Sequence, residues 1–212
     1  MKKEKKTQRT KERILAAAIV EFGTKSYDSA SINTICAESQ VSKGLLYHNF
    51  KGKDDLYLQC VALCYQEMLS YIQQRDTGPG DFDIPKWLAI RQSFFAEHPH
   101  YSNIFFNTVL QPPKHLIGQI HAIRKDFDAY YQQHLKTFLC RLPLRGGITT
   151  ETALSCFLVF SEMYNGYFQN KALETEDYKT LIDAHEGKMA QLFDILLYGL
   201  ARQPETNPHD PE

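Results

Sequence analysis

The fold can be worked out from residues 41–56, which read Val41-Ser42-Lys43-Gly44-Leu45-Leu46-Tyr47-His48-Asn49-Phe50-Lys51-Gly52-Lys53-Asp54-Asp55-Leu56. Ser42 is placed to cap a short helix from Lys43 to about Asn49, because a serine hydroxyl accepts a hydrogen bond from a free N–H of the first turn. Lys51-Gly52-Lys53 breaks this helix, and a long helix is predicted from about Asp54 to Arg75. The stretch therefore indicates a short capped helix followed by a long one.

The short helix is predicted to have two different faces. Helical spacing turns Val41, Leu45, Leu46 and Phe50 toward a core. The opposite face carries a cation, a small residue and two aromatic hydrogen-bonding side chains, without a carboxylate, and so suits the major groove of DNA. A glycine costs roughly 1 kcal/mol in a helix relative to alanine, which indicates close approach of a partner. The residues of this outward face are Lys43, Gly44, Tyr47 and His48.

The residues before this stretch predict two further helices. The first runs from about Thr10 to Lys25, and the second begins after Ser31, another candidate cap, and ends near Glu38. Two short helices joined by a tight turn, behind a longer packing helix, form a helix-turn-helix. The apolar residues expected in its core are Ile14, Leu15, Ala18, Phe22, Ile32 and Ile35.

These segments together resemble the DNA-binding signature of the TetR family. Residues 41–56 carry most of the resemblance, and the upstream segments 13–18, 22–23 and 31–36 fit the family pattern in order and spacing. The resemblance covers about residues 10–57, and the ending 192–200 is similar to the family's last helix. It implies an all-α fold of about nine helices, in which a three-helix helix-turn-helix domain is joined by a long helix to a helical ligand-binding and dimerisation domain. The expected parts are a basic arm with the DNA-binding domain (1–53), an effector-binding and dimerisation domain (54–202) and a frayed tail (203–212).

The resemblance also implies roles for individual residues. Ser31, Ser42, Tyr47 and Lys53 are expected to contact phosphates, the last aided by the positive N-terminal end of its helix. Lys43 and His48 are the expected base contacts, and Gly44 and Lys51 complete the predicted DNA-binding surface. The sequence departs from the family pattern at Leu45, where a small hydroxyl residue is common, and at Cys36 and Glu38, where small alanine positions are usual.

The charge distribution supports a nucleic-acid partner. Residues 1–53 carry eleven Lys and Arg against five Asp and Glu, a net of +6, whereas the remainder carries thirteen against twenty, a net of −7. A basic head on an acidic body indicates that the head meets a polyanion. The first residues are interpreted either as a solvated tail or as an arm that reaches the minor groove or adds salt-dependent affinity. The basic residues of this arm are Lys2, Lys3, Lys5, Lys6 and Arg9.

The remaining sequence predicts a helical body. No apolar run approaches the roughly 18 residues that span a membrane, so a cytoplasmic protein without a membrane partner is expected. Turn-forming residues fill 76–81, and prolines and glycines separate the later helices. These helices are predicted near 84–97, 101–110, 114–140, 150–170 and 177–201.

The body is expected to sense a small molecule and to form a homodimer on a palindromic double-stranded operator. Its middle helices are rich in aromatic residues and carry polar residues that could line a mixed cavity for a partly aromatic or amphipathic effector. The candidate pocket residues are Arg91, Phe95, Phe105, Asn107, Gln111, Phe127, Tyr131, His134, Glu162 and Asn165. The candidate dimer residues, on the last two helices, are Leu154, Phe157, Leu158, Ser161, Leu192, Ile195, Leu196 and Tyr198.

Other functions fit parts of the sequence. A metal or an oxidant is an alternative trigger, because Cys60 and Cys64 lie one helical turn apart and His98 and His100 flank Pro99. A helical interaction module without DNA binding is a further alternative, but it leaves the +6 head unexplained. The motifs of phosphate-binding loops, serine hydrolases and zinc proteases are absent from the sequence, so neither an enzyme nor a cofactor is expected. The resemblance implies repression, the family's usual mode.

Overall fold

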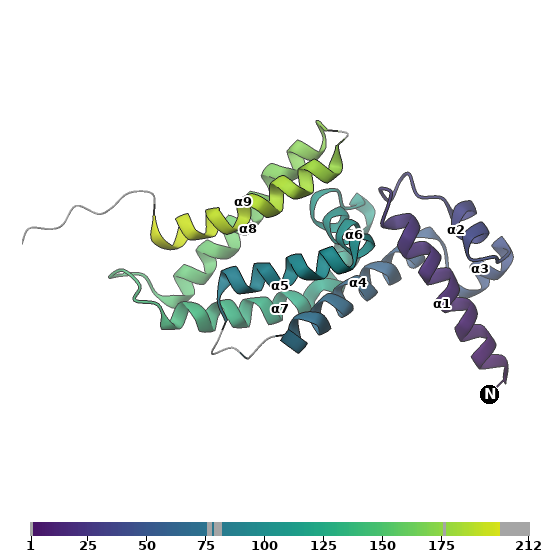
Figure 1. The fold of residues 1–212 in the computed structure, drawn as a ribbon, viewed down its shortest axis with the longest axis horizontal. Helices are drawn as coiled ribbons and strands as arrows, with labels where there is room; N and C mark the ends of the chain where they lie inside the picture. The colour runs from purple at the N-terminus through teal and green to yellow at the C-terminus, as the bar shows by residue number, and fades with distance from the viewer. Residues whose placement is uncertain (1, 76–77, 79–81, 176, 200–212) are drawn as a thin grey trace, which may run out of the picture.

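The computed structural model describes residues 2–75, 78, 82–175 and 177–199, and the side chains of residues 2–5 lie outside that description. Within the described residues the chain is helical and has no strand (Figure 1), which confirms the predicted all-α fold. The predicted tail at 203–212 and most of the turn at 76–81 lie outside the described residues. The elements are α1 (Lys2–Phe22), α2 (Ile32–Glu38), α3 (Lys43–Asn49), α4 (Lys53–Arg75), α5 (Ile84–Glu97), α6 (Pro99–Leu110), a 3₁₀ turn η2 (Lys114–Leu116), α7 (Ile117–Arg141), α8 (Thr150–Ala172) and α9 (Tyr178–Tyr198).

The first helix differs from the prediction at both ends. It begins at Lys2 rather than near Thr10 and ends at Phe22 rather than near Lys25. Lys, Glu, Gln and Arg, which are good helix formers, make up most of residues 2–9 and include no Gly or Pro, so the helix continues through them. The basic arm is therefore the first two turns of α1. Lys6 and Arg9 are exposed on it, whereas the side chains of Lys2, Lys3 and Lys5 are not among those described.

The helix-turn-helix has the core that the sequence predicts. Ile14, Ala18 and Phe22 of α1 are fully buried, as are Ile35 of α2 and Leu46 of α3. Both short helices have the predicted bounds, because each begins after a serine cap. The three helices lie together at one end of the molecule, with the N-terminus beside them (Figure 1).

Helix α4 connects this domain to the body. Figure 1 shows it running from the helix-turn-helix into the body beside α7. Leu56 and Tyr57 in its first turn and Met68 and Ile72 near its end are all fully buried, so the helix belongs to the core at both ends. Helix α4 therefore packs in both the DNA-binding domain and the body.

Most aromatic residues of the body form its core. The Trp87 ring of α5 lies 5.2 Å from Tyr131, 6.1 Å from Phe127 and 6.1 Å from Tyr130, all on α7. Ring pairs at these separations add to the hydrophobic gain of burying large side chains. The aromatic density that the sequence shows is thus mainly structural.

A second junction joins the two domains through α1 and α6. A Cβ atom placed on Gly23, just after α1, would lie 2.5 Å from Cβ and 2.7 Å from Cα of His100. Asn103 donates a hydrogen bond to the Gly23 carbonyl (2.6 Å), and Asn107 donates one to the Lys25 carbonyl (3.3 Å). The end of α1 therefore rests directly on α6 and is held there by two amide side chains.

Candidate nucleic-acid interface

Two serines define the starts of the short helices. The Ser31 hydroxyl accepts hydrogen bonds from the N–H groups of Asn33 (3.2 Å) and Thr34 (3.5 Å), and the Ser42 hydroxyl accepts one from Leu45 (3.2 Å). Both are caps of the kind the sequence predicts. Each hydroxyl uses its oxygen as the acceptor and keeps its hydrogen available to donate to another group, such as a phosphate.

The turn between the two helices is held by an arginine of α1. Gln40 lies in the left-handed region at φ 52°, a conformation that favours glycine, and the Val41 N–H closes the turn onto the Cys36 carbonyl at 3.0 Å. The Arg13 guanidinium donates to the carbonyls of Ser39 and Gln40, the latter at 3.3 Å. Arg13 thereby stabilises the strained turn, a role that the sequence pattern did not indicate.

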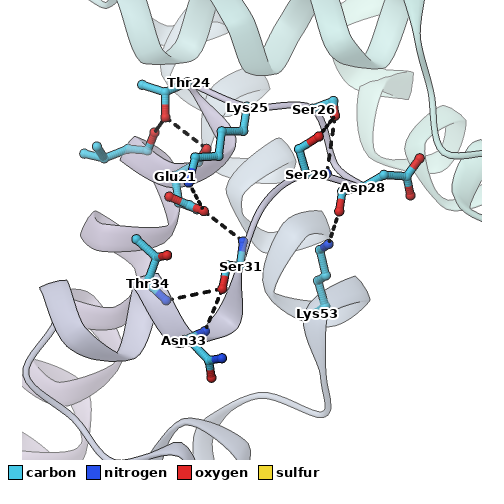
Figure 2. Close-up of polar contacts among 11 residues, drawn as sticks. Glu21, Thr24, Lys25, Ser26, Asp28, Ser29, Ser31, Asn33, Thr34 and Lys53 are labelled. Atoms are coloured by element: carbon cyan, nitrogen blue, oxygen red, sulfur yellow. Dashed lines mark hydrogen bonds and ion pairs between the residues drawn. The ribbon is translucent and has the colours of Figure 1, made fainter.

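A buried carboxylate orients the first short helix, as Figure 2 shows. Glu21 on α1 is 5% exposed, and its Oε1 atom accepts from the Ser31 N–H (2.8 Å) and from the Lys25 ammonium (2.8 Å). Burial raises the pKa of Glu21, but the contacts with Lys25 and Ser31 outweigh it, so the pKa lies below its ordinary value. Glu21 therefore fixes Ser31 while remaining charged.

The exposed face of α3 matches the predicted surface with one correction. Lys43, Gly44, Tyr47 and His48 are exposed, and Tyr47 is 53% accessible. Leu45, expected to face inward, is 40% exposed, so that prediction is wrong. The helix has only seven residues, and among its side chains Leu46 alone is buried, so the neighbouring Leu45 turns outward with the polar residues.

Gly44 is not required by the packing of this chain. The nearest atom to a Cβ built on it is the Ser42 hydroxyl oxygen, 4.0 Å away. The space on this side of α3 is therefore open to a partner, as the sequence predicts. The α3 segment contains no Asp or Glu, so no carboxylate of α3 itself opposes a phosphate backbone.

Two lysines of the predicted DNA-binding surface, Lys51 and Lys53, differ in their surroundings. Lys51 is exposed between α3 and α4. The Lys53 ammonium donates to the Asp28 carbonyl at 3.3 Å and lies 4.6 Å from the centre of the Tyr27 ring. Lys53 therefore braces the loop before α2, as Figure 2 also shows, and this contact uses one of the three N–H donors of its ammonium.

This arrangement agrees with the comparison to known proteins. Residues 14–60 match the family described as bacterial regulatory proteins, tetR family. The chain is a TetR-family transcriptional regulator.

Relatives span most of the regulator's length. It is 26% identical to the transposon Tn10 TetC protein of Escherichia coli over 178 residues, covering 82% of this chain and 84% of TetC. It is 21% identical to the biofilm operon icaADBC HTH-type negative transcriptional regulator IcaR of Staphylococcus aureus over 154 residues, covering 73% of this chain and 81% of IcaR.

Solved structures share the fold of the regulator at lower identity. The fatty acid degradation regulator FadR of Bacillus halodurans has a TM-score of 0.63 at 13% identity, covering 91% of this chain and 97% of FadR. FadR of Bacillus subtilis, solved in complex with stearoyl-CoA, has a TM-score of 0.59 at 15% identity, covering 90% and 99%.

The predicted pocket residues of the regulator do not line one cavity. Tyr131, Glu162 and Asn165 lie on a cleft of about 630 Å³ between α6, α7 and α8. Gln111 instead donates to the Ala172 carbonyl at 3.1 Å, and Asn107 holds the α1 junction. The other predicted residues are buried in the body: Arg91, Phe95, Phe105, Phe127 and His134.

A buried polar network accounts for Arg91. Its guanidinium lies 2.6 Å from a carboxylate oxygen of Glu186 on α9, and the side chains of both are almost fully buried. The same oxygen lies 3.2 Å from Nδ1 of His185, whose Nε2 lies 3.0 Å from the Asn165 side-chain oxygen. Burial raises the pKa of Glu186, but the charge of Arg91 and the contact with His185 outweigh it and keep the pKa low. His185 and Glu186 had no sequence signal, because their partners are remote in the chain.

Of the eight predicted dimer residues, only Phe157 is buried, Tyr198 is exposed and the other six are half-buried. Leu158 and Ser161 line the α6–α7–α8 cleft, and Leu154 packs half-buried against the core. The remaining five line a separate groove between α7, α8 and α9: Phe157, Leu192, Ile195, Leu196 and Tyr198. The apolar side chains that α8 does expose are Val159 (52%), Met163 (69%) and Tyr167 (54%). Their four-residue spacing was the available signal for this exposed stripe.

The two cysteines behind the metal and redox alternatives are placed unfavourably for sensing. Cys60 and Cys64 are fully buried, and burial raises the pKa of both thiols, which disfavours the thiolate that binds metals or reacts with oxidants. Among the described residues no group of three or more His, Cys, Asp and Glu could hold a metal ion. In the same part of the chain no helix has the length and apolar character needed to cross a membrane.

Proposed function

We propose that the protein is a repressor that binds a palindromic operator as a homodimer and leaves it when a small molecule binds the body. The observation that carries DNA binding is the exposed side of α3, where Lys43, Gly44, Tyr47 and His48 stand together without a carboxylate. Arg13 and Glu21 hold the turn and the start of α2, so this side is presented rigidly. Repression is supported by the likeness to IcaR, a negative transcriptional regulator.

The exposed stripe on α8 supports a homodimer. Val159, Met163 and Tyr167 are each more than half exposed and follow one side of the helix at four-residue spacing. Contiguous exposed apolar side chains mark interaction sites, and a two-fold dimer would bury this stripe against its own copy. We expect Met163→Glu to produce monomers in sedimentation experiments and to weaken operator binding. Lys125→Glu, at an exposed position on α7, is the matched control that should remain dimeric.

The cleft between α6, α7 and α8 is the proposed effector site. It holds both charged and apolar side chains, and Thr108 of α6 lines it. On the same helix Asn103 and Asn107 hold the carbonyls at the end of α1. A ligand that binds better to a shifted position of α6 would therefore move the DNA-binding domain. The fold accommodates a small molecule in a structural neighbour, FadR of Bacillus subtilis with stearoyl-CoA.

Operator binding is tested by fluorescence anisotropy with a duplex from the region upstream of the protein's own gene. Lys43→Ala or His48→Ala should each cost about 1–3 kcal/mol of specific binding, because each removes a base contact. Lys51→Ala should instead weaken binding to all sequences and reduce the salt slope by about one. Lys125→Ala, on the body, should change neither quantity. If the folded dimer bound no sequence in a genome-wide selection, the proposal would be wrong and an interaction module would replace it.

A further inference from the structure

The C-terminal ends of α7 and α9 and the start of α8 lie at the end of the body farthest from the helix-turn-helix (Figure 1). A large groove lies between them. It has a volume of about 920 Å³ and lies between the C-terminal ends of α7 and α9, the first half of α8 and the loop 142–149. Leu139 and Phe157, almost fully buried, form its floor, and Arg145, Cys156 and Tyr198 are exposed at its edge. The volume is in the range of small-molecule sites in proteins.

The lining of the groove is mostly apolar. Leucine, isoleucine and phenylalanine side chains supply most of it. Among the described residues that line the groove, Arg145 alone has a formal charge, and none of them is a carboxylate. In the described part of the chain, no hydrogen bond or ion pair engages the Arg145 guanidinium. A cation without a partner at the edge of an apolar groove is matched by a ligand with an apolar chain and an anionic head.

We propose that this groove binds an amphipathic anion, with its alkyl chain among the leucine and isoleucine side chains and its head group on Arg145. The apolar chain gains the free energy of leaving water, and the guanidinium pairs with a carboxylate through charge-assisted hydrogen bonds. A cationic amphiphile of the same length lacks this pair and is repelled by Arg145. The site is separate from the α6–α7–α8 cleft, and ligand binding there does not depend on operator binding.

Two exposed cysteines allow the site to be tested in the full chain. Cys156 and Cys140 are both exposed. Cys156 lines the groove, whereas Cys140 on α7 does not line it. N-ethylmaleimide labels both thiols, and mass spectrometry of the two peptides measures each rate separately. Dodecanoate, used below its micellar concentration, should slow labelling of Cys156 and leave Cys140 unchanged. Dodecyltrimethylammonium at the same concentration should protect neither.

An Arg145 variant tests the head-group contact. Arg145→Gln should raise the dodecanoate concentration for half-protection about tenfold, because one charge-assisted pair is lost. Protection by 1-dodecanol, which has no charge, should be the same in both proteins. Equal protection of the two cysteines, or an unchanged dodecanoate response in Arg145→Gln, would overturn the proposal.

The same labelling experiment would reveal either of two other occupants of the groove. If Cys156 is labelled far more slowly than Cys140 without ligand, the groove is already covered and the proposal is wrong. Recovery of Cys156 labelling on dilution would identify a second copy as the cover. Recovery in a variant that ends at Gly199 would identify the chain's own C-terminal segment. None of these measurements involves DNA, so their failure is independent of the operator-binding proposal.

Discussion

Replacing Gly23 with alanine should push the end of α1, in the DNA-binding domain, away from the start of α6 in the body. The new Cβ would lie 2.5 Å from Cβ and 2.7 Å from Cα of His100, and 2.6 Å from the Ile19 carbonyl oxygen. Carbon atoms pack at about 3.5–4.0 Å, so the end of α1 and the start of α6 must move apart by about 1 Å. Two of the three close atoms belong to the backbone, and a side-chain rotation therefore does not relieve the overlap.

The cost can be estimated from the two interactions that change. Overpacking a tight contact costs typically about 1–3 kcal/mol, and loss of the Asn103 hydrogen bond to Gly23 adds about 1 kcal/mol. We therefore expect the free energy of unfolding to fall by about 2–4 kcal/mol. Urea unfolding, followed by circular dichroism, measures this change, and operator titration should show weaker binding because the recognition helix is displaced.

Gly118→Ala is the matched control for this prediction. Gly118 is exposed in the first turn of α7, and a Cβ there meets nothing within 4 Å, so alanine should be neutral or stabilise by up to about 1 kcal/mol. The double variant Gly23→Ala/His100→Gly should recover only part of the loss, because the new Cβ still overlaps the backbone of residue 100. Gly23→Ala with the same urea midpoint as Gly118→Ala would refute the close approach of α1 to α6.

Three further predictions concern buried charges. Glu21→Ala should lower the free energy of unfolding by about 2 kcal/mol and weaken operator binding, because the Ser31 N–H and Lys25 lose their acceptor. Urea unfolding and fluorescence anisotropy measure the two effects, and Glu21→Gln, which keeps an acceptor oxygen, should lose less in both. Equal losses in the two variants would contradict this account. Arg91→Leu should destabilise by about 3–5 kcal/mol because Glu186 is left buried without its cation, and Arg91→Leu/Glu186→Leu should recover much of this in thermal unfolding. Burial lowers the pKa of His185 below its ordinary 6.5, so the unfolded state binds more protons than the folded state. The free energy of unfolding should therefore decline as pH falls below about 6.5. His185→Gln should show a flatter pH dependence of stability, and an identical pH profile would exclude His185 as the cause.

The candidate pocket shows why function in the body was harder to predict than in the head. The sequence identified aromatic and polar residues on the right helices, but not which of them meet. Arg91 and Glu186 are 95 residues apart, so their pairing has no local pattern. Three of the ten predicted pocket residues reach the α6–α7–α8 cleft, while most of the others fill the core.

The sequence alone determined the helix-turn-helix, because its determinants are local. Serine caps at Ser31 and Ser42 satisfy N–H groups within three residues, and helical spacing identifies the buried Ile14, Ala18 and Phe22 without knowledge of other elements. The bounds of α2 and α3 follow from these signals.

Only the tertiary structure decided how that unit is oriented and what the body encloses. Leu45 is exposed because α3 is too short to bury both of its leucines, and Gly23 is needed because α6, distant in sequence, crosses the end of α1. The groove beside Arg145 likewise exists only where three helices and a loop meet. Such features depend on contacts between residues far apart in the chain, and a periodic pattern carries no information about which distant surfaces come together.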